Sequence, residues 1–454
     1  MLTYELKKSP GVPLYEALYR CIRGDILSGA LKAGEKLPSK RALAENLEIS
    51  KITVETAYSQ LLSEGYIRSE EKVGYFVEAV ERPVHKTVSP VIREEAAHTS
   101  RLDLTANGTE QFPFSVWSKL QREVMLDYGE KLLLPLPYQG IPELRQAIAD
   151  HLAAFRGMTV DPENILIGAG TDFLYNLLIQ LLGRDKTYAV EEPGYGKIRK
   201  IYAAGGVACL SAPMDALGVR PDGLEKADIL HISPSHHFPT GIVTPTARRQ
   251  ALIAWAKAAE DRWIIEDYYD SEFRFDAHPM VAMLSMDRER VIYMNSFSKT
   301  LAPSIRISYM VLPGPLMEAF REKLSFYSCT VPSFEQYTLA RFLSRGYFEK
   351  HINRMRKFYR NRRNRVVAAL ENCPFADKLT ILEQDAGLHF LLKVDTELSD
   401  RELTEKLAAA GIRIRALSSY YHGNTENPHH LVVNYSGLKE EALEEALAAI
   451  GEIM

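Results

Sequence analysis

One stretch of the chain, residues 295–301, places a lysine among hydroxyl side chains directly after an apolar run. That run, residues 291–294, predicts a buried strand. At the end of such a strand, the amine of Lys299 could attack a carbonyl carbon and form a Schiff base. Nearby groups could hold a phosphate beside it, namely Ser296, Ser298 and Arg306. This combination fits pyridoxal phosphate (PLP), although Ser-x-Ser-Lys alone more often marks a solvated surface lysine.

Other apolar runs alternate with helical patterns and would position this lysine. They lie at residues 164–167, 187–190, 206–210, 228–231, 263–266 and 291–294. Alternation of this kind predicts an α/β domain built on a mostly parallel sheet. Such sheets bind ligands at the carboxyl ends of their strands. The residues that follow each run are therefore the candidates for a site.

Several polar or aromatic residues follow these runs. Gly170 and Thr171 lie in a glycine turn whose amides could cradle a phosphate at a helix N-terminus. Tyr195 could stack on a flat ring, and Asp267 could pair with a protonated pyridine nitrogen. Tyr269 shares the strand face of Asp267 and could reach a phenolic oxygen. The structural alternatives are an ordinary glycine turn, a core tyrosine and a helix cap.

The first 78 residues predict a separate small domain. Residues 13–27 form an amphipathic helical pattern, Ser39 is placed to cap a second helix, and Ser50 is placed to cap a third. Two short strands follow at residues 66–68 and 75–77. Helix, helix, turn, helix and β-hairpin together form a winged helix-turn-helix, whose third helix would enter the major groove of DNA.

The DNA-facing residues of this domain would lie at the starts of helices and at the wing tip. They are Ser39, Lys40, Arg41, Ser50, Lys51, Thr53, Lys72 and Gly74. Eleven Lys and Arg balance eleven Asp and Glu in residues 1–80, so net charge alone does not favour DNA. A small helical oligomerisation or cap domain is the alternative.

The composition is that of a soluble protein with more than one domain. The 454 residues exceed what one core normally serves, and the chain is 46% hydrophobic with a net charge of -4. It has no apolar signal core and no apolar run long enough to span a bilayer. Four widely spaced cysteines favour a reducing cytoplasm, and the paired histidines lack zinc spacing, so no metal site is predicted.

Changes in pattern along the chain predict the domain boundaries. Residues 79–101 are polar and aperiodic, which predicts a linker. Residues 102–454 hold the α/β domain, with a smaller α+β part from about residue 340 to residue 454. A helix in that part is strongly basic over residues 354–365, which indicates either a solvated face or a second DNA contact.

Two sets of motifs resemble known families. Leu37-Pro38-Ser39-Lys40-Arg41-Ala42-Leu43-Ala44, with Glu64-Gly65-Tyr66-Ile67, closely resembles the GntR family of transcription factors. The larger domain resembles the aminotransferases of PLP fold type I through an ordered series of motifs: Tyr138-Gln139-Gly140, Gly168-Ala169-Gly170-Thr171, Glu192-Pro193-Gly194-Tyr195, Phe238-Pro239-Thr240-Gly241, Asp267-x-Tyr269, Ser296-x-Ser298-Lys299 and Arg306. Joined in one chain, they resemble the MocR subfamily of regulators over essentially the whole sequence.

The resemblance implies a role for each residue of the series. Lys299 would form the Schiff base with PLP, Asp267 would pair with the pyridine nitrogen, Tyr269 would contact the phenolic oxygen and Tyr195 would stack. The phosphate would be bound by Gly170, Thr171, Ser296, Ser298 and Arg306. Tyr138 would come from the partner subunit of a head-to-tail homodimer, in which each DNA-binding domain crosses to the other protomer. The partner of that domain would be a double-stranded DNA operator.

The sequence departs from fold type I at one place. These enzymes usually bind the substrate carboxylate with a C-terminal arginine, and no arginine stands in residues 429–436. Candidate substitutes for effector binding are Lys197, His236, His429 and His430. The first hypothesis is a PLP-dependent regulator that senses a small amine or a vitamin B6 metabolite. The second is an active aminotransferase that carries a DNA-binding domain, and the missing arginine favours the first.

Overall fold

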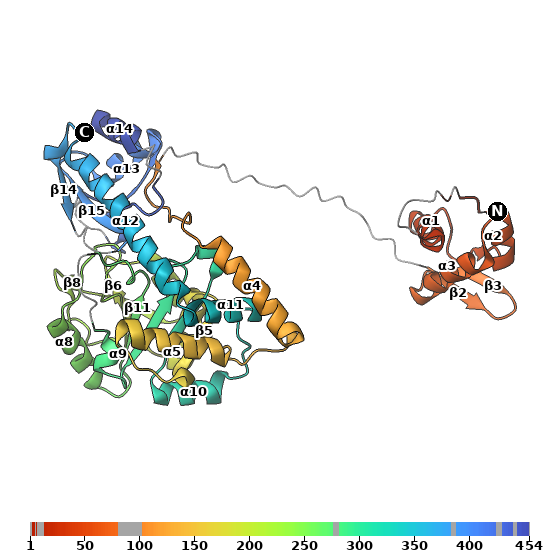
Figure 1. Cartoon of the computed structure of the whole chain (residues 1–454), viewed down its shortest axis with the longest axis horizontal. Helices are drawn as coiled ribbons and strands as arrows, with labels where there is room; N and C mark the ends of the chain where they lie inside the picture. The colour runs from red at the N-terminus through yellow and green to blue at the C-terminus, as the bar shows by residue number, and fades with distance from the viewer. Residues whose placement is uncertain are drawn as a thin grey trace. The chain divides into compact units, whose positions relative to one another are not determined.

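The computed structural model describes residues 2–4, 6, 13–79, 102–275, 281–382, 387–423, 429–438 and 443–453. The chain divides into two compact units, Met1–Ala97 and His98–Met454. Both are shown in Figure 1 and are described separately below. The linker predicted over residues 79–101 lies, apart from Ala79, outside the described residues.

The N-terminal unit has the predicted winged helix-turn-helix fold. Its elements are α1 (Leu14–Ser28), β1 (Lys36–Leu37), α2 (Lys40–Asn46), α3 (Lys51–Ser63), β2 (Ile67–Glu70) and β3 (Gly74–Val77). The side chains of Ser39 and Ser50 accept from the backbone amides of Ala42 and Thr53, both at 3.1 Å, as the sequence predicts. The sheet order is β1-β3-β2, so β1 adds a strand that the sequence pattern did not predict.

The core of this unit is built around α3. Val54, Ala57, Tyr58 and Leu61 recur at helical spacing and are fully buried. The hydroxyl of Tyr58 donates to the carbonyl of Pro38 at 3.0 Å, which satisfies the one polar group in this row. The buried face of α3 is thereby fixed, and its other face is left to solvent.

The large unit contains a seven-stranded sheet of order β5-β13-β12-β11-β10-β6-β7. The strands are β5 (Ile165–Gly168), β6 (Thr187–Glu191), β7 (Ala208–Ala212), β10 (Ile229–Ile232), β11 (Trp263–Tyr268), β12 (Val291–Ser296) and β13 (Ser308–Val311). All pairs are parallel except those of β13, which is antiparallel to both neighbours. The predicted mostly parallel sheet is confirmed, and β13 is the strand that the prediction lacked.

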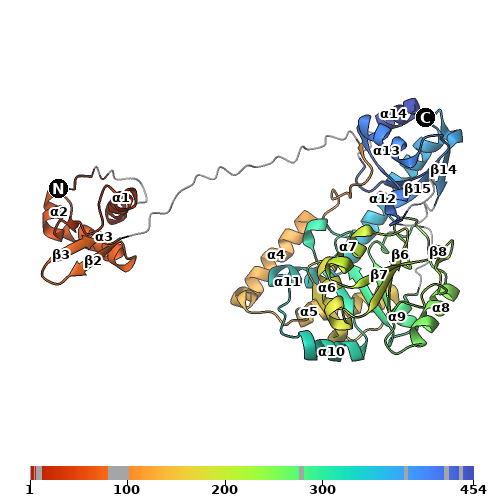
Figure 2. The same ribbon diagram turned by 180° about the vertical axis from the view of Figure 1, so that it is seen from behind.

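Helices cover both faces of this sheet. One face packs against α4 (Phe114–Tyr128), α5 (Pro142–Arg156), α8 (Thr246–Lys257), α9 (Met283–Met286) and α11 (Ser333–Ser344). The other packs against α6 (Thr171–Leu182), α7 (Gly196–Ala204) and α10 (Gly314–Leu324), and Figure 2 shows α6 and α7 from that side. Adjacent strand residues such as Ile264 and Ile265 enter opposite cores, which explains why these strands are apolar throughout.

The remainder of the large unit is an α+β part, as predicted. The long helix α12 (Tyr347–Glu371) leads to a four-stranded antiparallel sheet of order β14-β15-β18-β17. After α12, the elements of this part of the chain are β14 (Leu379–Leu382), β15 (His389–Val394), α13 (Asp400–Ala409), β16 (Ile412–Arg413), β17 (Arg415–Ala416), β18 (His430–Asn434) and α14 (Leu443–Ile453). The short strand β4 (Leu102–Asp103) pairs with β16, and β8 (Met214–Asp215) with β9 (Gly218–Val219). No helix within the described residues is both long enough and apolar enough to cross a membrane.

Replacing Leu61 by Ala should destabilise the N-terminal unit by about 3 kcal/mol, because a fully buried side chain is lost and a cavity remains. Amide hydrogen exchange of the full chain, followed by mass spectrometry, should show faster exchange in α3. The matched control is Ile52→Ala on the same helix, where the side chain is 74% exposed. Equal effects of the two changes would contradict the assigned core.

Candidate functional site

Lys299 lies in the turn that follows β12, at the carboxyl end of the sheet. Its Nζ donates to the side-chain oxygen of Asn107, which also accepts from Asn434 at 3.2 Å. Burial lowers the pKa of Lys299, and the charge of Asp270 opposes that shift. A lysine of lowered pKa is more often neutral, and the neutral amine is the form that attacks a carbonyl.

A cradle of amides, hydroxyls and a guanidinium forms beside this lysine. Ser308 of β13 pairs with Gly168 on one side and Ser296 on the other, which brings the glycine turn and the lysine turn together. Gly170 has φ of 90°, and a Cβ there would clash with the guanidinium of Arg306. The hydroxyl of Ser296 accepts from the amide of Ser298 at 3.2 Å. The structure thus brings four of the predicted phosphate-binding residues close together, namely Gly170, Ser296, Ser298 and Arg306.

Lys197 belongs to this cradle. Its Nζ pairs with Asp172, and the same carboxylate lies 3.3 Å from Arg306. Although burial acts to raise the pKa of Asp172, the hydrogen bonds and charges of Lys197 and Arg306 lower it overall. Two cations thus gather at the N-terminus of α6, where an anion is also favoured by the helix dipole.

Asp267 is the penultimate residue of β11 and lies within a buried hydrogen-bond network. Its Oδ2 accepts from the hydroxyl of Tyr175 and lies 3.6 Å from Nε2 of His231. The other ring nitrogen of His231, Nδ1, lies 2.7 Å from the hydroxyl of Tyr202. Its Oδ1 is buried and has no partner among the described residues. Neither Tyr175 nor His231 is among the site residues predicted from the sequence. The signal for Tyr175 was its position one helical turn after Thr171, on the same face of α6.

The predicted aromatic residues divide into two groups. Phe238 makes edge contacts with Tyr195 and Tyr269, with ring centroids 5.9 and 6.4 Å apart, and the hydroxyl of Tyr269 lies 3.2 Å from Nδ1 of His236. Tyr195 is 52% exposed, so its ring is open to a ligand. The ring of Tyr138 instead stacks on Phe320 of α10, 5.9 Å away.

The four predicted effector residues are not brought together. His236 lies near Tyr269, whereas Lys197 shares Asp172 with Arg306. On β18, Asn434 pairs with His389, whereas His430 pairs with Lys393 at the other end of the strand. His429 lies 3.4 Å from Asp400 of α13. The middle of β18 is apolar, because Val432 packs with Leu391 and Leu417.

The predicted DNA-facing residues all lie in the N-terminal unit, and two of its cations, Lys40 and Arg41, have carboxylate partners. Lys40 pairs with Glu55 at 2.7 Å and the exposed Arg41 with Glu45 at 2.8 Å. Lys51 is exposed, and Ser50 and Thr53 share a hydrogen bond of 2.8 Å. At the wing, Lys72 and Gly74 both have positive φ, of 60° and 139°. The analysis missed Ile52, whose 74% exposed side chain could contact a thymine methyl group.

Fold and site together define a class: a winged helix-turn-helix domain joined to an aminotransferase-like domain. Residues 14–77 match the bacterial regulatory proteins of the gntR family, and residues 100–450 match aminotransferase class I and II. The chain belongs to the GntR-type regulators with an aminotransferase domain, the MocR type. It is accordingly a DNA-binding transcriptional regulator, and the alternative of an enzyme that merely carries a DNA-binding domain is not favoured.

Relatives and solved structures agree with this assignment. The HTH-type transcriptional regulator YdeL of Bacillus subtilis is 36% identical, covering 98% of each chain. The probable rhizopine catabolism regulatory protein MocR of Rhizobium meliloti is 30% identical, over 98% of this chain and 94% of its own. The kynurenine aminotransferase of Pyrococcus horikoshii has a TM-score of 0.69 and 25% identity, over 78% of this chain and 92% of its own.

Replacing Lys299 by Met should raise the thermal stability of the protein without cofactor most at low pH. The pKa of Lys299 is lower in the folded state than in the unfolded chain, so the unfolded chain binds this proton more tightly. Below the ordinary lysine pKa, protonation therefore favours unfolding. The penalty is complete below the folded-state pKa and vanishes above the ordinary one. The difference in Tm between variant and wild type should therefore shrink as the pH rises from 6.5 towards 10. A difference independent of pH would contradict the lowered pKa.

Replacing Arg41 or Lys51 by Ala should weaken DNA binding and reduce the salt dependence by about one unit of slope each, since each change removes one phosphate contact. Fluorescence anisotropy on a DNA fragment selected from a random pool would measure both. Arg20→Ala on α1 is the matched control, an exposed arginine that also pairs with a glutamate. Unchanged binding in both test variants would mean that the DNA-facing side is wrongly assigned.

Proposed function

We propose that the aminotransferase-like unit binds PLP at Lys299 and senses a small amine or a vitamin B6 metabolite, and that this binding controls the affinity for an operator. One observation carries the proposal. Three features lie together where the strands of the sheet have their carboxyl ends: Lys299 after β12, the cradle around Arg306 between β5 and β13, and the unpaired Oδ1 of Asp267 on β11.

The residues present fit PLP. Asp267 Oδ1 is a buried acceptor without a described partner, which suits a protonated ring nitrogen. Gly170, Thr171, Ser296, Ser298 and Arg306 supply amides, hydroxyls and a guanidinium for a phosphate, and Lys197 adds a charge that the sequence analysis assigned elsewhere. Tyr195 and Tyr269 would contact the ring. When bound, PLP supplies an electrophilic carbon with which amines react.

The missing carboxylate arginine supports a sensor over an enzyme. Where fold type I enzymes use arginine, β18 presents Val432 against Leu391 and Leu417. An unpaired carboxylate in a dry pocket costs several kcal/mol, and an unanchored substrate is poorly oriented for reaction. A ligand can therefore bind Lys299's site without efficient turnover.

The proposal includes the assembly. The protein would act in the cytoplasm as a head-to-tail homodimer, with each DNA-binding domain crossing to the other protomer and Tyr138 reaching the partner's site. The effector would shift the dimer between DNA-binding geometries. The size of that shift is set by the difference between its affinities for the two states.

Purified protein reconstituted with PLP should be yellow, and Lys299→Ala should lose the absorbance band of the lysine-bound cofactor. Titration with candidate amines should shift this band in the wild type. Conversion of an amino acid and 2-oxoglutarate should stay below about 0.01 per second, against about 10 per second for a median enzyme. Asn434→Asp, which alters a neighbour but keeps the lysine, should retain the band.

Two results would contradict the proposal in different ways. A wild type that cannot be reconstituted with PLP would exclude the cofactor. A yellow protein with sustained turnover at enzyme rates would exclude the sensor and favour the aminotransferase.

A further inference from the structure

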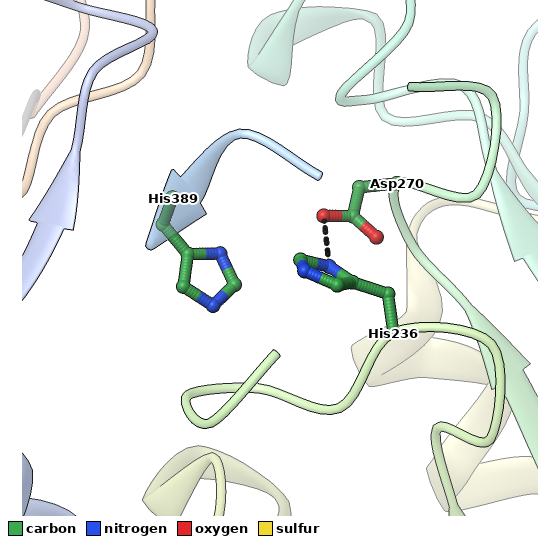
Figure 3. A group of neighbouring side chains, drawn as sticks. All are labelled: His236, Asp270 and His389. Atoms are coloured by element: carbon green, nitrogen blue, oxygen red, sulfur yellow. Dashed lines mark hydrogen bonds and ion pairs between the residues drawn. The ribbon is translucent and has the colours of Figure 1, made fainter. Parts of the chain in front are cut away.

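Two buried histidines and an aspartate meet close enough to Lys299 for their charges to interact with it, and Figure 3 shows these three side chains. His236 lies in the segment after β10, Asp270 follows β11 and His389 begins β15. All three are at most 4% exposed. The imidazole centroids are 4.8 Å apart with the planes tilted by 50°. One nitrogen of each ring and one oxygen of Asp270 lie within 4.8 Å of one another.

The hydrogen bonds of the two histidines determine which nitrogen of each ring is free. Nδ1 of His236 lies 2.9 Å from the carboxylate of Asp270, and Nε2 of His389 lies 3.2 Å from the carbonyl of Pro239. A carboxylate and a carbonyl only accept, so both of these nitrogens must donate. In neutral rings, Nε2 of His236 and Nδ1 of His389 are then lone-pair acceptors.

Two of the acceptors in this cluster are left without a donor. Nε2 of His236 and Oδ1 of Asp270 are buried and have no hydrogen-bond partner among the described residues. Buried acceptors that gather without a donor are costly unless a cation or a donor group lies between them.

Gly387 fixes the position of the His236 ring. Its φ is 73°, and a Cβ on this residue would overlap the imidazole. The amide of Gly387 donates to the carbonyl of Phe273 at 2.8 Å, and its own carbonyl accepts from the hydroxyl of Tyr435. The backbone is therefore anchored on both sides where it packs on the ring, which pre-organises one ligand.

We propose that His236, Asp270 and His389 form a binding site for a divalent transition-metal ion, with Zn²⁺ the best match. Two imidazoles and one carboxylate suit Zn²⁺ and its neighbours rather than Mg²⁺ or Ca²⁺, which prefer all-oxygen sites. Zn²⁺ held tetrahedrally at about 2.0–2.1 Å sets neighbouring ligand atoms about 3.3 Å apart. Because the ligand atoms lie up to 4.8 Å apart here, their separations would have to shorten by up to about 1.5 Å when the ion binds.

Asp270 has a different role with and without the ion. Without it, Oδ2 accepts from Nδ1 of His236 and orients that ring. With an ion on Nε2 of the same ring, the carboxylate turns to the ion, and the hydroxyl of Tyr269, 3.2 Å from Nδ1, accepts in its place. The negative charge of Asp270 then offsets part of the charge of the ion, and its Oδ1 is available to ligate. Three protein ligands leave a fourth position for water or a ligand group. The site does not depend on PLP, because none of its ligands belongs to the proposed cofactor-binding set.

The test is a titration of the full chain, stripped of metal by a chelator and free of added PLP, with Co²⁺ alone. Wild type should bind one ion per chain and develop the visible d–d bands of a four- or five-coordinate site. His236→Gln and His389→Gln should each weaken binding at least about 100-fold, because even residues behind the ligands contribute 10–100-fold. His422→Gln, an exposed histidine outside the cluster, is the control and should bind as wild type does.

Two outcomes would overturn the proposal: wild type that binds Co²⁺ no better than the two cluster variants, or binding that is lost in His422→Gln. Should the cluster variants not fold, X-ray absorption of the wild type with one equivalent of Zn²⁺ decides the question. Two imidazole ligands and a carboxylate oxygen support the site, and sulfur or a single imidazole overturns it. The readouts are independent of the absorbance of bound PLP, so failure of this proposal leaves the proposed function standing.

Discussion

The antiparallel insertion of β13 between β5 and β12 is the constraint on which the lysine site depends. Ser308 opens β13 and pairs at once with Gly168 and Ser296, the last residues of its two neighbours. Because β13 runs the other way, its start lies where the other strands end. Arg306, two residues before Ser308, therefore lies against the glycine turn that follows β5. The turn that carries Lys299 follows β12, on the other side of β13. Burial of β13 on both faces makes this arrangement rigid.

Local signals allowed much of the fold to be predicted from the sequence. Ser39 and Ser50 start their helices because a hydroxyl before a helical pattern satisfies free amides, and this requires no distant contact. β13 was not predicted because its four residues, Ser308–Val311, are too few to show an alternating or helical pattern. They form a strand because they pair with β5 on one side and β12 on the other. The predicted α+β part gave no sign that two adjacent short strands, β16 and β17, join different sheets.

Site residues were predictable where a sequence motif holds them and not where only the fold does. Lys299 and Gly170 follow strands and Asp267 lies at the end of one, so the rule about strand ends finds them. His236 and His389 are distant in sequence and meet only because β15 approaches the segment after β10. The basic run on α12 had two possible roles, and the structure assigns several of its arginines to internal contacts. Arg356, Arg360 and Arg362 donate to backbone carbonyls of other segments.

The ion pairs on the DNA-binding domain have a consequence for how the protein searches a chromosome. Lys40 and Arg41 are held by Glu55 and Glu45, so a DNA phosphate that takes either cation as its partner displaces a carboxylate of the protein rather than a mobile anion. Non-specific affinity comes almost entirely from phosphate contacts, and a broken pair offsets part of any contact that these two residues make. Such contacts would then add little to binding on random DNA. Contacts to base edges, made only at the correct site, carry a larger share of the total binding free energy.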